Sequence, residues 1–209
     1  MHKFNPHSSR IKGILYLESL KTILTVGEDG KIAVIDENMR SIMNTTKISE
    51  YGLTNLVSEE QKKRIFVADK YGSFYILSIV SLPPLLTVKV STGIKDYIRC
   101  IDVDFTKQFI FIASDLGYIK VMQYDSDVTH PKIDEIELIS MHEEMRSLLW
   151  LTESSLLLIG SRKGLIRFYD VIGKKFMMNF NAHTDSLKQI TGNEKRLVTV
   201  SKDKSMALW

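Results

Sequence analysis

Three residues near the end of the chain have the side-chain types of a hydrolase triad. His183, Ser201 and Asp203 would supply a general base, a hydroxyl nucleophile and a carboxylate that orients the base. The same side-chain types also form networks that satisfy buried polar groups inside a folded domain. Because these residues lie within a repeated unit of β-strands, we expect them to stabilise the fold rather than to catalyse hydrolysis.

Two other segments resemble sites for phosphate or metal. The run from Gly160 to Gly164 is basic, but it lacks the phosphate-loop order Gly-x-x-x-x-Gly-Lys-Ser/Thr and precedes a strand-like stretch instead of a helix. His142 and Glu143 begin like a zinc-helix motif, yet no second histidine follows four residues after the first. Cys100 is the only cysteine. We therefore expect no catalytic residues, no cofactor, no metal and no enzymatic activity.

The composition indicates a globular protein. Apolar residues make up 44% of the 209 residues and charged residues 25%, and a single cysteine excludes a disulfide framework. No apolar run approaches the length of about 18 residues that a membrane span needs, and no apolar signal region follows Met1. The net charge of +3 is too small to indicate nucleic acid as a partner. We predict a cytoplasmic protein without a transmembrane segment.

A short pattern recurs five times along the chain. In each copy two apolar and two small residues lead into a turn, and alternating apolar residues follow it. Alternation with a period of two is typical of half-buried strands, and glycine between two such stretches predicts a tight hairpin turn. Successive turns are separated by 42, 45, 47 and 40 residues. The turn residues are Gly30, Gly72, Gly117, Gly164 and Lys204.

Two further strands are predicted around each hairpin. An apolar residue lies 19 residues before each turn glycine and 17 before Lys204; these residues are Ile11, Leu53, Ile98, Met145 and Leu187. Candidates for a fourth strand follow at residues 41–48, 85–91, 135–140 and 176–182. Four-stranded antiparallel units arranged radially form a β-propeller. We predict an all-β propeller of about five such blades, in a single domain over residues 1–209.

The repeat resembles that of the WD-repeat family over the whole chain. The fifth copy is similar in Ala182-His183, in Ser201-Lys202-Asp203 before the turn and in Trp209. The fourth copy has Tyr169-Asp170 where the family has Trp-Asp, and the second and third copies lack both the histidine and this pair. The resemblance implies a propeller that binds proteins or peptides and carries no catalytic chemistry.

The resemblance also implies a side-chain network. In the family a histidine bridges the aspartate of the turn and a strand Ser or Thr, which reaches the indole N–H of the tryptophan. Here this network would comprise His183, Asp203, Thr199 or Ser201, and Trp209. Because the other copies lack the tryptophan, we expect the network to survive only in the fifth copy.

A closer similarity concerns the WD-repeat and FYVE-domain proteins of endosomes. Residues 7–11 with 26–30, and residues 168–175, are similar to propeller blades of these proteins. The zinc-binding FYVE module is absent, because Cys100 is the only cysteine. Any association with a membrane would therefore come through partners in a complex.

The two ends of the sequence suggest how the propeller is arranged. Phe4-Asn5-Pro6-His7 matches Phe180-Asn181-Ala182-His183, so we expect residues 2–5 to form the fourth strand of the last blade. Such closure would remove an exposed sheet edge. Three arrangements remain open: a closed ring of five blades, part of a larger propeller, or an incomplete ring that a partner chain completes.

Loops that connect strands carry binding residues on a rigid scaffold. The repeat phase places two sets of loop residues at equivalent positions on one face, the loop face. One set precedes the first strands: Arg10, Gly52, Tyr97, Glu144 and Ser186. The other precedes the hairpin turns: Glu28, Lys70, Asp115, Arg162 and Lys202. Arginine and tyrosine often dominate binding energy, so Arg10, Tyr97 and Arg162 are the strongest candidates. The basic run at residues 61–64 is expected to be a solvated turn on the opposite side.

These observations predict a non-catalytic scaffold that binds a protein or peptide through its loop face. The alternative is a structural subunit of a larger assembly, in which further blades or a partner chain complete the propeller. The two hypotheses differ in where apolar surface is exposed, because the second requires an uncovered apolar face on a terminal blade.

Overall fold

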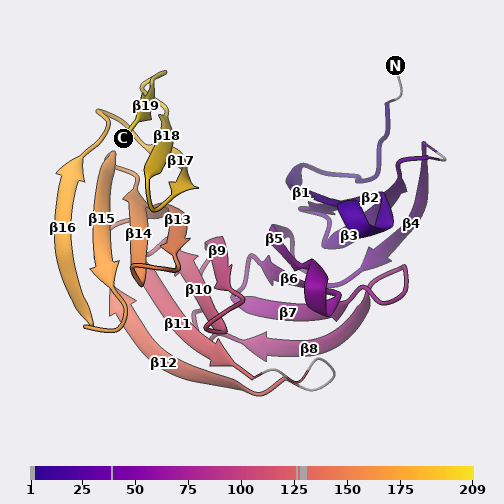
Figure 1. Cartoon of the computed structure of the whole chain (residues 1–209). Helices are drawn as coiled ribbons and strands as arrows, with labels where there is room; N and C mark the ends of the chain where they lie inside the picture. The colour runs from indigo at the N-terminus through magenta and orange to yellow at the C-terminus, as the bar shows by residue number, and fades with distance from the viewer. Residues whose placement is uncertain (1–2, 39, 126, 128–130) are drawn as a thin grey trace. The chain divides into compact units, whose positions relative to one another are not determined.

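The structure, a computed structural model, describes residues 3–38, 40–125, 127 and 131–209. The fold is all-β and of the β-propeller class, with five antiparallel blades, which confirms the predicted fold class (Figure 1). The two helical segments among these residues are short 3-10 helices, η1 (Glu18–Leu20) and η2 (Glu60–Lys62). Within the part of the chain that the structure describes, no helix is both long and apolar enough for a membrane span.

The chain divides into two compact units. Unit 1 comprises residues 1–98 and 125–132, and unit 2 comprises residues 99–124 and 133–209. Blades one and two belong to unit 1, and blades three, four and five belong to unit 2. The single domain over residues 1–209 stays a prediction.

The two blades of unit 1 each pair four strands in chain order. Blade one contains β1 (Ile11–Leu17), β2 (Thr22–Gly27), β3 (Lys31–Asp36) and β4 (Ser41–Lys47). Blade two contains β5 (Leu53–Glu59), β6 (Arg64–Asp69), β7 (Ser73–Ser78) and β8 (Leu85–Ser91).

Unit 2 contains two four-stranded blades and one three-stranded blade, again paired in chain order. Blade three contains β9 (Ile98–Asp104), β10 (Phe109–Ser114), β11 (Tyr118–Tyr124) and β12 (Ile133–Ser140). Blade four contains β13 (Met145–Leu151), β14 (Leu156–Ser161), β15 (Leu165–Asp170) and β16 (Lys175–Asn181). Blade five contains β17 (Leu187–Asn193), β18 (Arg196–Ser201) and β19 (Met206–Leu208).

The strand boundaries follow the phase of the repeat. The first strand of every blade begins at the predicted apolar residue, namely Ile11, Leu53, Ile98, Met145 and Leu187. The fourth strands β4, β8, β12 and β16 start and end within two residues of the predicted segments. In blades two to five this first residue is fully buried, whereas Ile11 of blade one is about half-exposed.

Four of the hairpin turns favour glycine for two reasons. The four turn glycines have φ between 75° and 89°, a conformation that costs side chains other than glycine about 1 kcal/mol or more. In addition, a Cβ at Gly30 would lie 2.0 Å from the carbonyl oxygen of Ser49, and one at Gly164 would lie 2.2 Å from that of His183. The segment that leads into the next blade therefore packs directly on the turn. Lys204, the substitute in blade five, has a φ of 68°.

In unit 1 the core lies where blade one meets blade two. Leu24 and Val26 of β2 pack in one fully buried cluster with Leu53 of β5 and with Ile65 and Val67 of β6. Burying each such side chain contributes about 1.5–3 kcal/mol. One continuous core therefore joins these two blades.

In unit 2 the core continues from blade three to blade five. The ring of Phe111 stacks on Trp150, with centroids 4.6 Å apart, and the indole N–H of Trp150 donates to Asp104 at 2.6 Å. On the other side of blade four, Leu158 packs with Leu187 and other residues of blade five. These contacts fix the orientation of the loops within the unit.

The N-terminal fourth strand for blade five stays a prediction, because residues 3–5 belong to unit 1 and blade five belongs to unit 2. Residues 3–5 form no strand, and residue 2 lies outside the described residues. The sheet of blade five contains three strands, β17, β18 and β19. The Phe-Asn-Pro-His match coincides with the similar lead-in to β1 and β17, where His7 and His183 take equivalent places.

Candidate protein-interaction face

Blade five contains the network that the WD-repeat resemblance implies. Nδ1 of His183 lies 3.0 Å from a carboxylate oxygen of Asp203, and Nε2 lies 2.8 Å from Oγ1 of Thr199. The indole N–H of Trp209 donates to the same Oγ1 at 3.0 Å. Of the two candidates for the strand hydroxyl, Thr199 makes this contact, whereas the hydroxyl of Ser201 donates to backbone carbonyls of the lead-in segment.

The strand hydroxyl at the centre of this network is shielded from solvent. Thr199 is fully buried, so its hydroxyl is not accessible to a substrate. Hydrogen bonds from Ser205 and Thr184, together with His183, hold the pKa of Asp203 well below its usual range, although desolvation opposes them. A carboxylate with a lowered pKa stays ionised and keeps accepting these hydrogen bonds at neutral pH.

The expectation that only blade five keeps such a network is wrong. In blade one, Nδ1 of His7 lies 3.0 Å from Asp29, and Nε2 lies 2.9 Å from Oγ1 of Thr25. Partial burial alone would raise the pKa of Asp29, but hydrogen bonds from the Ser8 N–H and from His7 lower it. The histidine and the turn aspartate are thus sufficient for the bridge without a tryptophan.

In blade two, different residues form the hydrogen bonds of the equivalent region. The buried carboxylate of Asp69 accepts hydrogen bonds from the hydroxyls of Ser49 and Tyr75 at 2.8 and 2.7 Å. It also accepts from the N–H groups of Tyr71 and Ser73, each at 2.9 Å. Ser49 lies 23 residues before its turn glycine, as His7 does, so the repeat phase contained a signal for this replacement.

The two predicted sets of loop-face residues are joined by backbone hydrogen bonds within the blades. In blades one, two, four and five the N–H of the residue before the turn donates to the carbonyl of the residue before the first strand, at 2.9 Å. The pairs are Glu28 with Arg10, Lys70 with Gly52, Arg162 with Glu144, and Lys202 with Ser186. In blades one, two, four and five the loop face is therefore an ordered continuation of the first two strands.

In unit 1, side chains of the loop face contact one another across blades one and two. The ammonium of Lys70 lies 3.2 Å from the carboxylate of Glu28 and 5.7 Å from the ring centroid of Tyr97. The hydrogen bond with Lys70 lowers the pKa of Glu28, against the opposing effect of desolvation. Arg10 is exposed on the same unit.

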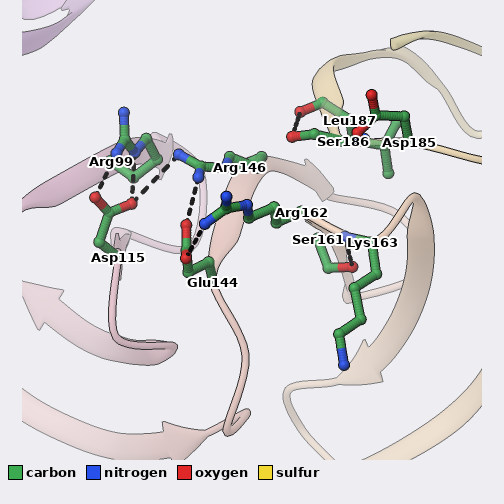
Figure 2. A network of polar contacts seen from close by, with 10 residues as sticks. All are labelled: Arg99, Asp115, Glu144, Arg146, Ser161, Arg162, Lys163, Asp185, Ser186 and Leu187. Carbon is green, nitrogen blue, oxygen red and sulfur yellow. Dashed lines mark hydrogen bonds and ion pairs between the residues drawn. The ribbon is translucent and has the colours of Figure 1, made fainter. Parts of the chain in front are cut away.

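In unit 2, the predicted residues form part of a larger ionic network. Figure 2 shows Arg99 and Arg146 directed at Asp115, and Arg146 and Arg162 directed at Glu144. The Nε of Arg99 donates to Asp115 at 2.7 Å. Hydrogen bonding with Arg162 lowers the pKa of Glu144, with a further contribution from the charge of Arg146 and with desolvation opposing.

The sequence did not predict Arg99 and Arg146 as residues of the loop face. Each is the second residue of the first strand in its blade. In blade four the pairing of β13 with β14 shifts between Met145 and Ser147, so that Arg146 is the extra residue of a β-bulge. Bulges redirect a side chain relative to the regular alternation of a strand. Here the bulge turns the guanidinium of Arg146 toward the loop face, where Asp115 and Glu144 accept it.

A pocket of about 540 Å³ lies beside this network in unit 2. Its lining combines acidic and basic side chains with the exposed Leu116. The lining residues are Asp115, Leu116, His142, Glu143, Glu144, Arg162 and Lys163. The pocket thus offers a hydrophobic contact surrounded by charges of both signs, which suits an extended peptide or a protein loop.

Two exposed tyrosines in unit 1 also lie on the loop face and were missed. Tyr51 precedes Gly52, and Tyr71 follows Lys70 in the turn between β6 and β7. Their ring centroids are 4.1 Å apart. The only signal in the sequence was their position next to two predicted loop residues, and nothing local indicated that the rings would meet.

The basic run at residues 61–64 differs from the prediction in one respect. Lys62 and Lys63 lie in and after η2 as expected for a connection between strands. Arg64, however, is the first residue of β6 and is almost fully buried, with an ion pair to the buried Glu59. Only the first part of the run is a solvated turn.

Comparison with known proteins supplies no functional assignment. The chain matches no protein-family model, and no curated protein matches it. Among the described residues, no group of three or more His, Cys, Asp or Glu side chains has an arrangement that could hold a metal ion.

Proposed function

We propose that the protein is a non-catalytic scaffold of the WD-repeat type that binds a protein or peptide through its loop face. The observation that carries this proposal is the ionic network of unit 2, in which five charged side chains from blades three and four are held together beside an open pocket (Figure 2). Charges that are already ordered lose little conformational entropy when a partner binds.

The repeat resemblance and the composition support the same function. Propellers present variable loops on a rigid set of blades, and the predicted Arg10, Tyr97 and Arg162 are of the residue types that often dominate binding energy. We propose a cytoplasmic protein whose partner is a protein or peptide and not a nucleic acid. Any contact with a membrane would be made through partners.

The test compares two sets of alanine substitutions in the full chain. We expect the combined replacement of Arg10, Tyr97 and Arg162 to weaken capture of a crosslinked partner by about tenfold or more. The unfolding midpoint should not change, because these side chains lie outside the core. The control replaces Lys62 and Lys63, at the other end of blade two; Arg64 is not suitable because it is buried. Loss of the partner with the control and not with the first set would contradict the proposal.

A second candidate function is that of a structural subunit covered by another chain. On β1 of unit 1, Ile14 is 72% exposed, and on β19 of the three-stranded blade five, Met206 is 71% exposed. Exposed apolar side chains on sheet edges are typical of surfaces that a partner covers. Native mass spectrometry of the purified chain tests this candidate, because an obligate subunit would appear in a complex and an independent scaffold as a monomer.

A further inference from the structure

The pocket beside the ionic network of unit 2 has an excess of positive charge. Each of its three carboxylates is already paired with arginine: Asp115 with Arg99 and Arg146, Glu144 with Arg146 and Arg162, and Glu143 with Arg167. Lys163 lines the same pocket, and among the described residues its ammonium has no ion-pair partner. One arginine charge and the charge of Lys163 are therefore not balanced.

Charges from the neighbouring blade do not remove this excess. The segment that leads into blade five lies against the turn after Lys163, since a Cβ at Gly164 would be 2.8 Å from the backbone oxygen of Asp185. Asp185 is exposed, and so is Lys202, whose N–H donates to the same segment. These two side chains have opposite charges and cancel. His142, which also lines the pocket, adds positive charge only when it is protonated.

Arg162 and Lys163 lie in one tight turn between β14 and β15, which the hydroxyl of Ser161 fixes by accepting the N–H of Lys163 at 3.2 Å. The side chain of Arg162 is 59% exposed, and within the part of the chain that the structure describes only its Nη1 is engaged, with Glu144. Its other guanidinium donors are available to a ligand. Figure 2 shows the side chain of Lys163 extending away from that of Arg162, so the two cations border the pocket at separate points.

The pocket also contains an exposed apolar side chain. Leu116, in the turn between β10 and β11 of blade three, is 65% exposed. It belongs to the wall from blade three, whereas Arg162 and Lys163 belong to the wall from blade four. A ligand that contacts both walls therefore needs an apolar group next to anionic groups.

We propose that this pocket binds an acidic segment of a partner protein, whose carboxylates pair with Arg162 and Lys163 and whose apolar side chain packs on Leu116. The proposal rests on the proposed function, in that it takes the loop face as the binding surface and names the chemistry of the segment. Hydrogen bonds between arginine or lysine and a carboxylate are roughly twice as strong as those between neutral groups. An acidic segment also balances the excess of positive charge.

The same charges disfavour other classes of segment. A basic segment would have to displace the arginines that already occupy the three carboxylates, and the charge of Lys163 would repel it. A neutral segment would gain the contact with Leu116 and leave the excess charge unbalanced. A phosphate concentrates its charge on one group, whereas Arg162 and Lys163 extend apart, so two carboxylates along one segment match them better.

The test measures the Kd of the purified full chain for short fluorescent peptides by anisotropy. The probe contains Asp-Leu-Asp between glycine and serine residues, and its neutral counterpart contains Asn-Leu-Asn. We expect the acidic probe to bind at least about tenfold more tightly, because the amides keep the shape of the carboxylates and lose their charge. Two further peptides replace the aspartates with lysine, or with one phosphoserine and one serine. Equal binding of the acidic and neutral peptides, or tighter binding of the lysine or phosphoserine peptide, would overturn the proposal.

Variants then locate the binding. Lys163→Gln should weaken binding of the acidic probe by about tenfold and leave the neutral peptide unaffected, whereas Leu116→Ala should weaken both peptides alike because it removes only apolar contact. Lys195→Gln is the matched control, since Lys195 is an exposed lysine in the turn between β17 and β18 and does not line the pocket. An equal loss in Lys163→Gln and Lys195→Gln would refute the assignment to this pocket.

The failure of this inference differs from the failure of the scaffold function. If none of the peptides binds while the Arg10, Tyr97 and Arg162 set still abolishes partner capture, only the present inference falls and the scaffold function stands.

Discussion

Asp69→Ala is the substitution for which the structure allows the most detailed prediction. The carboxylate of Asp69 accepts four hydrogen bonds, two from hydroxyls and two from backbone N–H groups. The hydroxyls of Ser49 and Tyr75 belong to buried residues, so after the substitution neither finds water as a substitute. The two N–H groups belong to Tyr71 in the turn and to Ser73 at the start of β7, which are not buried, so water can replace the carboxylate there.

The magnitude follows from the two buried hydroxyls. Leaving one buried donor without an acceptor costs about 1–3 kcal/mol, so the free energy of unfolding should fall by about 2–6 kcal/mol. Asp69→Asn should cost less, because its carbonyl oxygen can still accept and its amide can donate to a rotated hydroxyl. Asp134→Ala, which removes an exposed carboxylate on β12, should change the free energy by less than about 0.5 kcal/mol.

Urea denaturation followed by circular dichroism measures the free energy of unfolding, and hydrogen exchange with mass spectrometry assigns the change to blade two. Both tryptophans lie in unit 2, so tryptophan fluorescence alone would miss a separate transition of unit 1. If Asp69→Ala unfolds within about 0.5 kcal/mol of the wild type, the interpretation of Asp69 as the central acceptor of blade two is incorrect.

Three further predictions concern unit 2. His183→Ala should lower the free energy of unfolding by about 1–3 kcal/mol, whereas His142→Ala, at an exposed position, should lower it less. If chemical denaturation shows equally small losses of unfolding free energy for both variants, the network of blade five is not supported. Burial raises the pKa of the Cys100 thiol to about 12, so alkylation near pH 8 should be slow in the native protein and fast in urea. The pKa of Glu144 is lowered, so its pairing with Arg162 should persist above the ordinary glutamate pKa of about 4.3 and be lost only as the pH falls through the lower native value. A carboxyl titration by NMR with a midpoint at or above the ordinary value would contradict this assignment.

The sequence was a good guide wherever structure is determined locally. The period of two and the positive φ of the turn glycines depend on neighbouring residues, and they placed the first strand of each blade at its observed first residue, as at Leu53 and Met145. The phase of the repeat also brought Arg162 and Glu144 together at one end of blade four. Periodicity was sufficient because the strands of each blade bury their apolar residues in the same arrangement.

The sequence was a poor guide to contacts between distant side chains. Arg146 reaches Asp115 only because a bulge redirects it, and bulges leave no clear mark in the sequence. Ser49 replaces a histidine in blade two because Asp69 and Tyr75 supply the remaining hydrogen bonds, and this compensation spans residues far apart in the chain. The expectation of a single surviving network failed because it assumed that the tryptophan was indispensable.

The backbone hydrogen bonds that join the two sets of loop-face residues have a consequence for protein engineering. Since Arg10 pairs with Glu28, and Glu144 with Arg162, through backbone atoms, the identity of these side chains is not needed to hold the loops in place. A combinatorial library at such positions would vary the chemistry of the surface while the strands beneath keep their pairing. The blades would then serve as a constant frame on which new specificities are selected, with the glycines of the turns left unchanged.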